Sequence, residues 1–63
     1  MMLRYLSEVR ANKGQVVSAD GRGGTLTGNA ESDGETMMVE VEFKSRVAPK
    51  FTEWFDALDV RVI

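Results

Sequence analysis

The segment from residue 51 to residue 58 has the strongest hydrophobic pattern in the chain. Its large apolar side chains recur at a spacing that places them on one side of a helix, within an arc of about 100°. These side chains are Phe51, Trp54, Phe55 and Leu58. Pro49 suits the first turn of such a helix, because its φ angle is already fixed near the helical value. The pattern therefore predicts a helix from Pro49 to Leu58 whose apolar stripe packs against the rest of the protein.

The clearest strand lies between Thr36 and Lys44. Apolar and polar residues alternate through it, which is typical of a strand with one buried and one exposed face. The side expected to be buried carries Met37, Val39, Val41 and Phe43, and the other side carries Met38, Glu40, Glu42 and Lys44. The apolar side gives the predicted helix a surface to cover, so Trp54 is expected to be buried in the core.

Four other segments have weaker strand patterns. They comprise residues 2–10, 15–19, 25–30 and 60–63. The run from Asp20 to Gly24 separates two of them and is typical of a β-hairpin tip. The predicted fold is α+β, a single domain of residues 1–63 with a small, mostly antiparallel sheet in the order β-β-β-β-α-β and one helix packed on one face.

Length and composition exclude several kinds of stabilisation and chemistry. A chain of 63 residues buries only about 60% of the surface that its unfolded form exposes, so self-association would help to stabilise it. The sequence has no cysteine and no histidine, which removes disulfides, thiolate and imidazole metal ligands, and nucleophiles that need an imidazole base. We therefore expect no enzyme activity, no cofactor and no metal site.

The charge balance is mildly acidic. The formal net charge is −2 and the isoelectric point is near 4.9, whereas general binders of the nucleic-acid backbone usually have a basic surface. No apolar run reaches the roughly 20 residues needed to cross a bilayer, and the first residues lack the pattern of a signal peptide. These features predict a cytoplasmic protein without membrane association, and they argue against nucleic acid as the partner.

Two loops resemble ligand-binding motifs superficially. Gly21 to Gly24 is rich in glycine, but no Lys-Ser or Lys-Thr pair follows it, which favours a hairpin tip over a phosphate-binding loop. Glu31 to Glu35 places three carboxylates around a glycine, yet it lacks the length of about 12 residues and the ligand spacing of a recognisable calcium loop. A solvated turn is the better interpretation of this second segment.

One helix covers only one face of a sheet, so the opposite face should remain open. The apolar and charged residues that strand alternation places on this open face are Met2, Leu6, Met38, Glu40 and Glu42. Methionine adapts well to partner surfaces, and clustered exposed apolar residues mark contact sites. As an alternative, the two glutamates could pair across the sheet with Arg4 and Arg10.

These features favour a small, non-catalytic protein-interaction module of the regulator or inhibitor type. It would bind itself, as a homodimer, or a larger protein, through the helix-free sheet face or an edge strand. Its size also suits a protein of a virus or a mobile element. The alternative is a nucleic-acid-binding module of the small-barrel type. Its stacking and phosphate contacts would come from Arg4, Tyr5, Arg10, Lys13 and Arg22.

Overall fold

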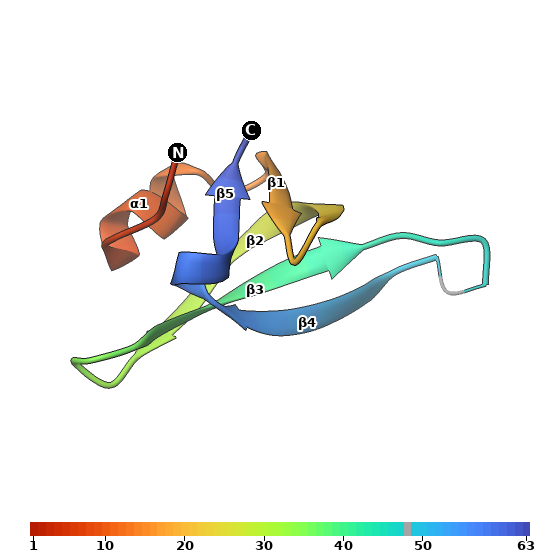
Figure 1. The fold of residues 1–63 in the computed structure, drawn as a ribbon. Coiled ribbons are helices and arrows are strands. Elements are labelled where there is room, and N and C mark those ends of the chain that lie inside the picture. Colours follow the sequence, from red (N-terminus) through yellow and green to blue (C-terminus); the bar gives the residue numbers. More distant parts are fainter. Residues whose placement is uncertain (48) are drawn as a thin grey trace.

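The computed structural model describes residues 1–47 and 49–63, which form one α-helix, one 3-10 helix and five strands (Figure 1). In chain order these are α1 (Leu6–Ala11), β1 (Val16–Ala19), β2 (Arg22–Ser32), β3 (Met37–Phe43), β4 (Phe51–Asp56), η1 (Ala57–Asp59) and β5 (Val60–Val62). The strands form one antiparallel sheet in the spatial order β4-β3-β2-β1-β5. The α+β class and the mostly antiparallel sheet are confirmed. The predicted order along the chain is wrong, because the α-helix precedes all five strands.

Four of the predicted strands and the predicted hairpin tip are present. The strands β1, β2, β3 and β5 overlap the segments predicted at 15–19, 25–30, 36–44 and 60–63. Between β1 and β2, Asp20 and Gly21 have φ angles of 53° and 76°, as a tight two-residue hairpin turn requires. Ala19 and Arg22 pair on either side of this turn, so the glycine-rich segment is a hairpin tip that continues directly into β2.

The predicted strand at residues 2–10 is wrong, because α1 occupies most of this segment. The Glu8 carboxylate accepts hydrogen bonds from the backbone N–H groups of Arg4 (2.8 Å) and Tyr5 (3.0 Å), which satisfies donors at the start of the helix. At the other end, the side-chain amide of Asn12 donates to the Glu8 carbonyl at 2.7 Å. These local hydrogen bonds outweigh the apolar alternation that suggested a strand.

The predicted helix from Pro49 to Leu58 is also wrong, because β4 occupies most of it. Every residue of β4 pairs with a residue of β3. Alternate side chains of a strand point to opposite faces, so the expected helical stripe is divided between two faces. Phe51 and Phe55 pack against the core, whereas Trp54 lies on the opposite side of the strand.

The core lies on one side of β2, β3 and β4. The sheet bends, so that β1, β5 and both helices lie above these three strands in Figure 1. The buried side chains are Leu3, Val9, Val17, Ala19, Leu26, Val39, Val41, Phe43, Ala57 and Val60. No polar or charged residue of the described segments is buried with them. Figure 1 shows neither helix over the other side of β3 and β4, so that side remains open.

The strand β2 connects the two halves of the bent sheet. It pairs with β1 through residues 22–25 and with β3 through residues 25–32. Gly24 lies at this change of partner, where a Cβ atom would come within 2.5 Å of Val41 Cγ1. Further along, a bulge interrupts the β2–β3 ladder around Gly28, whose φ angle is 92°. Glycine is therefore needed both for close packing and for the bulge.

Candidate interaction surface on β3 and β4

The strands β3 and β4 form a two-stranded surface that faces away from the core. Residues directly opposite each other in an antiparallel ladder share a face. The outward-facing pairs are Met38 with Asp56, Glu40 with Trp54, and Glu42 with Thr52. We call these six residues the outer face. It combines apolar, acidic and aromatic groups on a side of β3 and β4 that neither helix covers in Figure 1, and at one end Asp56 also contacts the start of η1.

Trp54 is the largest side chain on the outer face, and 43% of its surface remains exposed. The prediction that it is buried in the core is therefore wrong. The register explains the difference, because Trp54 pairs with Glu40 while its neighbours Glu53 and Phe55 pair with the buried residues of β3. An indole has a large apolar ring and a polar N–H, a combination that suits a protein interface.

The carboxylate of Glu40 is held in a fixed position beside Trp54. Thr27 Oγ1 and Asn29 Nδ2 both donate to Glu40 Oε1 at 3.0 Å. Hydrogen bonds from Asn29, then Thr27, and to a smaller extent Thr52, hold the pKa of Glu40 below its usual range, because they favour the charged carboxylate. The outer face thus has a positioned negative charge next to an apolar ring.

The predicted contact residues fall into two separate groups. The three on β3, namely Met38, Glu40 and Glu42, share the outer face. Met2 and Leu6 do not join them, because Met2 forms a bridge with Arg61 of β5 and Leu6 begins α1. The prediction of a single surface is wrong for these two residues, since it relied on strand alternation in a segment that is helical from Leu6 onward. Both side chains remain partly exposed.

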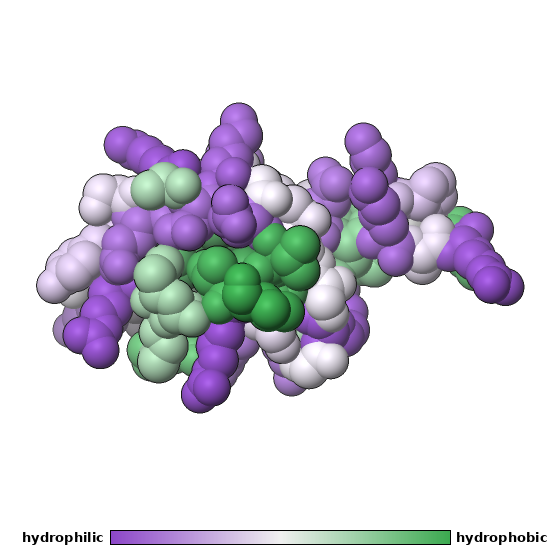
Figure 2. All heavy atoms as spheres, turned by 90° about the horizontal axis from the view of Figure 1, so that it is seen from above, coloured by the Kyte–Doolittle hydropathy of each residue, from purple (hydrophilic) through white to green (hydrophobic). Residues whose placement is uncertain are grey.

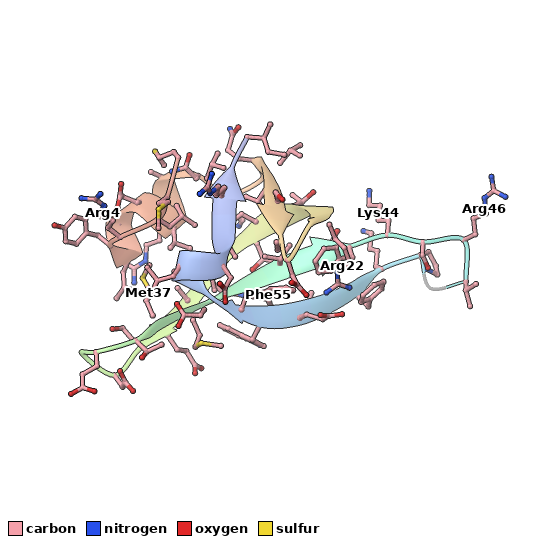
Figure 3. The ribbon with its side chains drawn as sticks, viewed as in Figure 1. Arg4, Arg22, Met37, Lys44, Arg46 and Phe55 are labelled. Atoms are coloured by element: carbon pink, nitrogen blue, oxygen red, sulfur yellow. The ribbon has the colours of Figure 1, made fainter. Side chains whose placement is uncertain are left out.

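The residues predicted for a nucleic-acid surface are spread over the molecule. On or beside α1 lie Arg4, Tyr5, Arg10 and Lys13. Arg22 lies instead at the β1–β2 hairpin, and Figure 3 shows it well separated from Arg4. Its guanidinium donates to the Glu53 carboxylate at 2.8 and 3.3 Å and lies over the Phe43 ring, 4.6 Å from the centroid. These residues therefore do not form one continuous basic stripe.

The Arg22–Glu53 ion pair lies on the core side of β4. Glu53 pairs with the buried Val41 in the β3–β4 register. The hydrogen bond between the two side chains raises the pKa of Arg22 and lowers that of Glu53. Both side chains retain over two fifths of their exposure, so the pair is at the rim of the core and remains hydrated.

The strand β4 is also the open edge of the sheet. Within the described residues, its only strand neighbour is β3. The opposite edge, β5, is partly covered, because the Met1 ammonium donates to the Val62 carbonyl and the Val62 N–H donates to the Met1 carbonyl, both at 2.8 Å. An unpaired edge exposes backbone donors and acceptors that can bind a further strand. The sheet offers such an edge at β4.

The two turns that flank β3 carry opposite charges. We call the segment between β3 and β4 the basic turn, and its charged residues are Lys44, Arg46 and Lys50. We call the segment around the β2–β3 connection the acidic turn, and its charged residues are Glu31, Asp33 and Glu35. Because β3 extends from one turn to the other, the two turns lie at opposite ends of a molecule that measures 36 × 20 × 18 Å (Figures 1 and 3).

A separate apolar patch surrounds the two chain ends. Met1, Val16 and Ile63 are 57%, 56% and 80% exposed, and the Ile63 N–H donates to the Val16 carbonyl at 3.1 Å. Figure 2 views the molecule from the side of the termini and shows apolar surface in the middle of that face, with hydrophilic side chains around it. We call these three residues the terminal patch; it lies away from the outer face.

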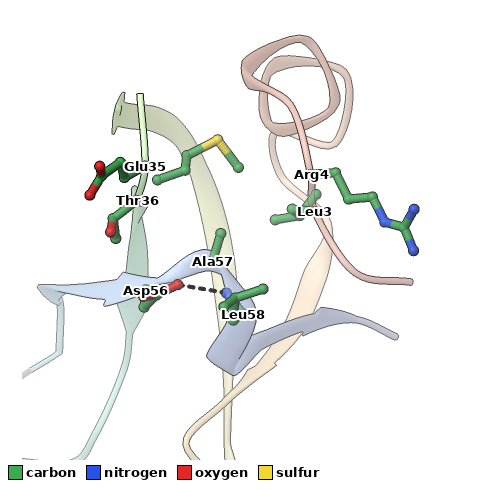
Figure 4. A pocket seen from close by; sticks show the side chains of 8 residues that line it. Leu3, Arg4, Glu35, Thr36, Asp56, Ala57 and Leu58 are labelled. Carbon is green, nitrogen blue, oxygen red and sulfur yellow. Dashed lines mark hydrogen bonds between the residues drawn. The ribbon is translucent and has the colours of Figure 1, made fainter. Parts of the chain in front are cut away.

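A hollow of about 380 Å³ lies between the N-terminal segment, the acidic turn and η1 (Figure 4). Its lining residues are Leu3, Arg4, Glu35, Thr36, Met37, Asp56, Ala57 and Leu58. The Asp56 carboxylate accepts the Leu58 N–H at 2.9 Å and so caps η1. None of the described polar side chains is buried, so the hollow lacks the convergent buried polar groups of a typical small-molecule site.

Comparisons of the chain with protein-family models, curated proteins and solved structures gave no match. Across residues 1–47 and 49–63, no helix has the length and apolar character needed to span a membrane. The same residues contain no group of three or more His, Cys, Asp or Glu side chains arranged to hold a metal ion. Function is therefore inferred from the geometry of the outer face and the open β4 edge.

Proposed function

We propose that this protein is a small, non-catalytic interaction module that binds a protein strand along the open edge of β4. The outer face forms part of the contact, and the bound strand belongs to a second copy or to a larger protein. The observation that supports this most strongly is the half-exposed indole of Trp54 on the edge strand.

The backbone of β4 supplies the first part of the binding energy. Addition of a strand to an exposed sheet edge is a common mode of protein recognition, in which main-chain hydrogen bonds give affinity and alternate side chains give specificity. The strand β4 has six residues, a typical strand length. Its pairing with β3 along its whole length keeps its backbone extended, so that the donors and acceptors on its open side are available to a partner strand.

The side chains of the outer face supply the second part. Trp54 is of the residue type that most often dominates interface energies, together with tyrosine and arginine. Met38 lies diagonally across the ladder and offers an adaptable apolar surface. The hydrogen-bonded carboxylate of Glu40 adds a fixed charge that orients a partner carrying a basic group nearby.

A photo-crosslinking residue tests this function in the source cell. Benzoylphenylalanine is placed at Thr52, which lies on the outer face, and separately at Arg61 on β5 as the control. We expect a covalent protein adduct from position 52, a much weaker one from position 61, and loss of the first adduct when Trp54→Ser is added. Equal adducts at both positions, or none at position 52, would contradict the proposal.

The basic turn supports one second candidate, binding of single-stranded nucleic acid. Lys44, Arg46 and Lys50 belong to the basic turn at one end of the molecule, and Lys50 directly precedes the partly buried Phe51. This candidate requires affinity for an oligonucleotide that falls steeply as salt is raised. Replacing all three cations by glutamine should abolish that affinity. No binding at low salt would exclude the candidate.

A further inference from the structure

Charge is distributed unevenly along the open edge of β4. Lys50 immediately precedes the strand, and Asp56 is its last residue. Met38 pairs with Asp56 on one side and with Glu31 on the other, so the acidic turn begins at the same end of the sheet as Asp56. The basic turn extends the positive charge beyond Lys50. The edge therefore has a basic end and an acidic end.

This polarity selects one way in which two copies can meet. Antiparallel pairing of two β4 edges places the basic end of each copy against the acidic end of the other, whereas parallel pairing would oppose like charges. We propose that two copies of this chain pair antiparallel through β4 about a two-fold axis, so that their sheets become continuous. This inference rests on the proposed function and names its partner.

Side-chain alternation restricts the register of this pairing. Residues directly opposite each other must share a face, so outward residues of one copy must oppose outward residues of the other. The register that sets Lys50 opposite Asp56 of the second copy also sets Thr52 opposite Trp54. Each indole then packs beside the strand of the other copy and loses much of its 43% exposure.

The core-side row of β4 is compatible with the same register. Phe51 comes opposite Phe55 of the second copy, and both side chains are only partly buried within one chain. Glu53 falls on the two-fold axis and faces its own equivalent. Arg22 already donates to Glu53 at 2.8 Å within each copy, which offsets the repulsion between the two carboxylates. In this register, a charge pair (Lys50 with Asp56) and an aromatic pair (Phe51 with Phe55) therefore form on each side of the two-fold axis.

Charge reversal in the full-length chain tests the pairing by sedimentation equilibrium. We expect the unmodified protein to dimerise reversibly, and Lys50→Glu or Asp56→Lys to weaken dimerisation about tenfold, because two symmetric attractions become repulsions. Both changes in one chain should restore the affinity to within about threefold of the original. Arg61→Glu on β5 is the control and should have no effect. If neither single charge reversal weakened the dimerisation affinity, the inference would be overturned.

The capping role of Asp56 requires a milder variant as well. Asp56→Lys removes the oxygen that accepts the Leu58 N–H and can therefore disturb η1. Asp56→Asn keeps a capping oxygen but removes the charge, and it should weaken dimerisation about threefold. Circular dichroism confirms that each variant is folded. Unchanged dimerisation of a folded Asp56→Asn protein would count against the charge pair.

Cysteine crosslinking tests the register directly, because the chain has no cysteine of its own. Residues directly opposite in an antiparallel pair have Cα atoms about 4.5–5.5 Å apart, within the range that a disulfide spans. Under mild oxidation Glu53→Cys should form a covalent dimer. Glu42→Cys lies one strand further from the axis and is the matched control. Equal crosslinking of both variants would overturn the proposed register.

Two results separate this inference from the proposed function. If the purified chain remains monomeric while position 52 crosslinks to another protein in cells, the inference fails and the proposed function stands. If a dimer forms but neither the charge reversals nor the cysteine variants affect it as expected, the copies meet elsewhere and the inference fails. The terminal patch of Met1, Val16 and Ile63 would then be the surface to vary.

Discussion

Gly24 of β2 is the position where one added methyl group should disturb this fold most selectively. A Cβ atom there would lie 2.5 Å from Val41 Cγ1 and 2.9 Å from both the Glu42 carbonyl oxygen and Phe43 Cε1. One of these neighbours is backbone, and the other two belong to buried side chains. None of them can rotate away into solvent, so β2 and β3 must move apart to accept alanine.

The size of the effect follows from two opposing contributions. Overpacking a well-packed core typically costs about 1–3 kcal/mol, whereas replacing glycine restricts the unfolded chain and returns about 0.4–1 kcal/mol. We expect Gly24→Ala to lower the free energy of unfolding by about 1–2 kcal/mol. A chain of 63 residues has a total stability of only about 3–9 kcal/mol. Each kcal/mol lost should lower Tm by about 4–8 °C.

Urea denaturation, followed by the fluorescence of the single tryptophan, measures this loss at a fixed protein concentration. Gly23→Ala is the matched control, because its added Cβ would have no neighbour within 4 Å. That variant should be unchanged, or more stable by up to about 1 kcal/mol. Equal stability of the Gly23→Ala and Gly24→Ala proteins would refute the close approach of β2 and β3 at Gly24.

Three further predictions concern single side chains. Phe43→Ala should lower the free energy of unfolding by about 3–5 kcal/mol, because the residue is only 5% exposed. Trp54→Thr, on the half-exposed outer face, should lower it by only about 1–2 kcal/mol. Urea titrations that rank the two variants the other way would contradict the assigned faces. The lowered pKa of Glu40 means that this residue stabilises the fold above its ordinary pKa of 4.5 and loses that contribution as the pH falls through the lower folded-state value. Glu40→Gln should therefore flatten the dependence of stability on pH below the ordinary pKa of 4.5. An unchanged dependence of stability on pH in acid would show that the hydrogen bonds of Glu40 do not stabilise the fold. Arg22→Lys keeps the charge but loses the two-pronged contact with Glu53, so a double-mutant cycle should give a smaller coupling with lysine than with arginine.

The strand β3 was predictable because apolar and charged residues alternate regularly from Val39 to Phe43. Val39, Val41 and Phe43 are buried, and the intervening residues lie on the outer face. The β1–β2 hairpin was equally predictable from the sequence, since an Asp-Gly pair between two strands supplies the positive φ angles that its turn needs. These local patterns determine their own structure, so the placement of Met38, Glu40 and Glu42 together on one face of β3 was predictable, whereas their role in binding stays a prediction.

The strand β4 was mistaken for a helix because a charged residue interrupts its alternation. As a strand, its core-facing row is Phe51, Glu53 and Phe55, and the glutamate makes the apolar pattern fit a helical spacing better. Glu53 tolerates this position because Arg22, 31 residues away in sequence, binds its carboxylate. A contact between such distant residues cannot be read from a local window. Trp54 was therefore missing from the predicted contact surface.

The prediction for the N-terminal segment was wrong for a different reason. Its apolar residues fit a strand as well as a short helix, and the choice depends on hydrogen bonds that Glu8 makes with the backbone of Arg4 and Tyr5. A glutamate three residues after a helix start is a known signature, but it usually follows a Ser, Thr, Asp or Asn cap. Tyr5 occupies the cap position here, so the usual signal was absent.

Quenching of Trp54 fluorescence across a dilution series tests most directly whether the β4 edge is a binding surface. Acrylamide should reach the half-exposed indole freely in the monomer and less well once another strand covers it. We expect the quenching constant to fall as the protein concentration rises, in step with the dimer fraction measured by sedimentation. Association that leaves the quenching constant unchanged would place the contact between the copies elsewhere and contradict self-association through β4.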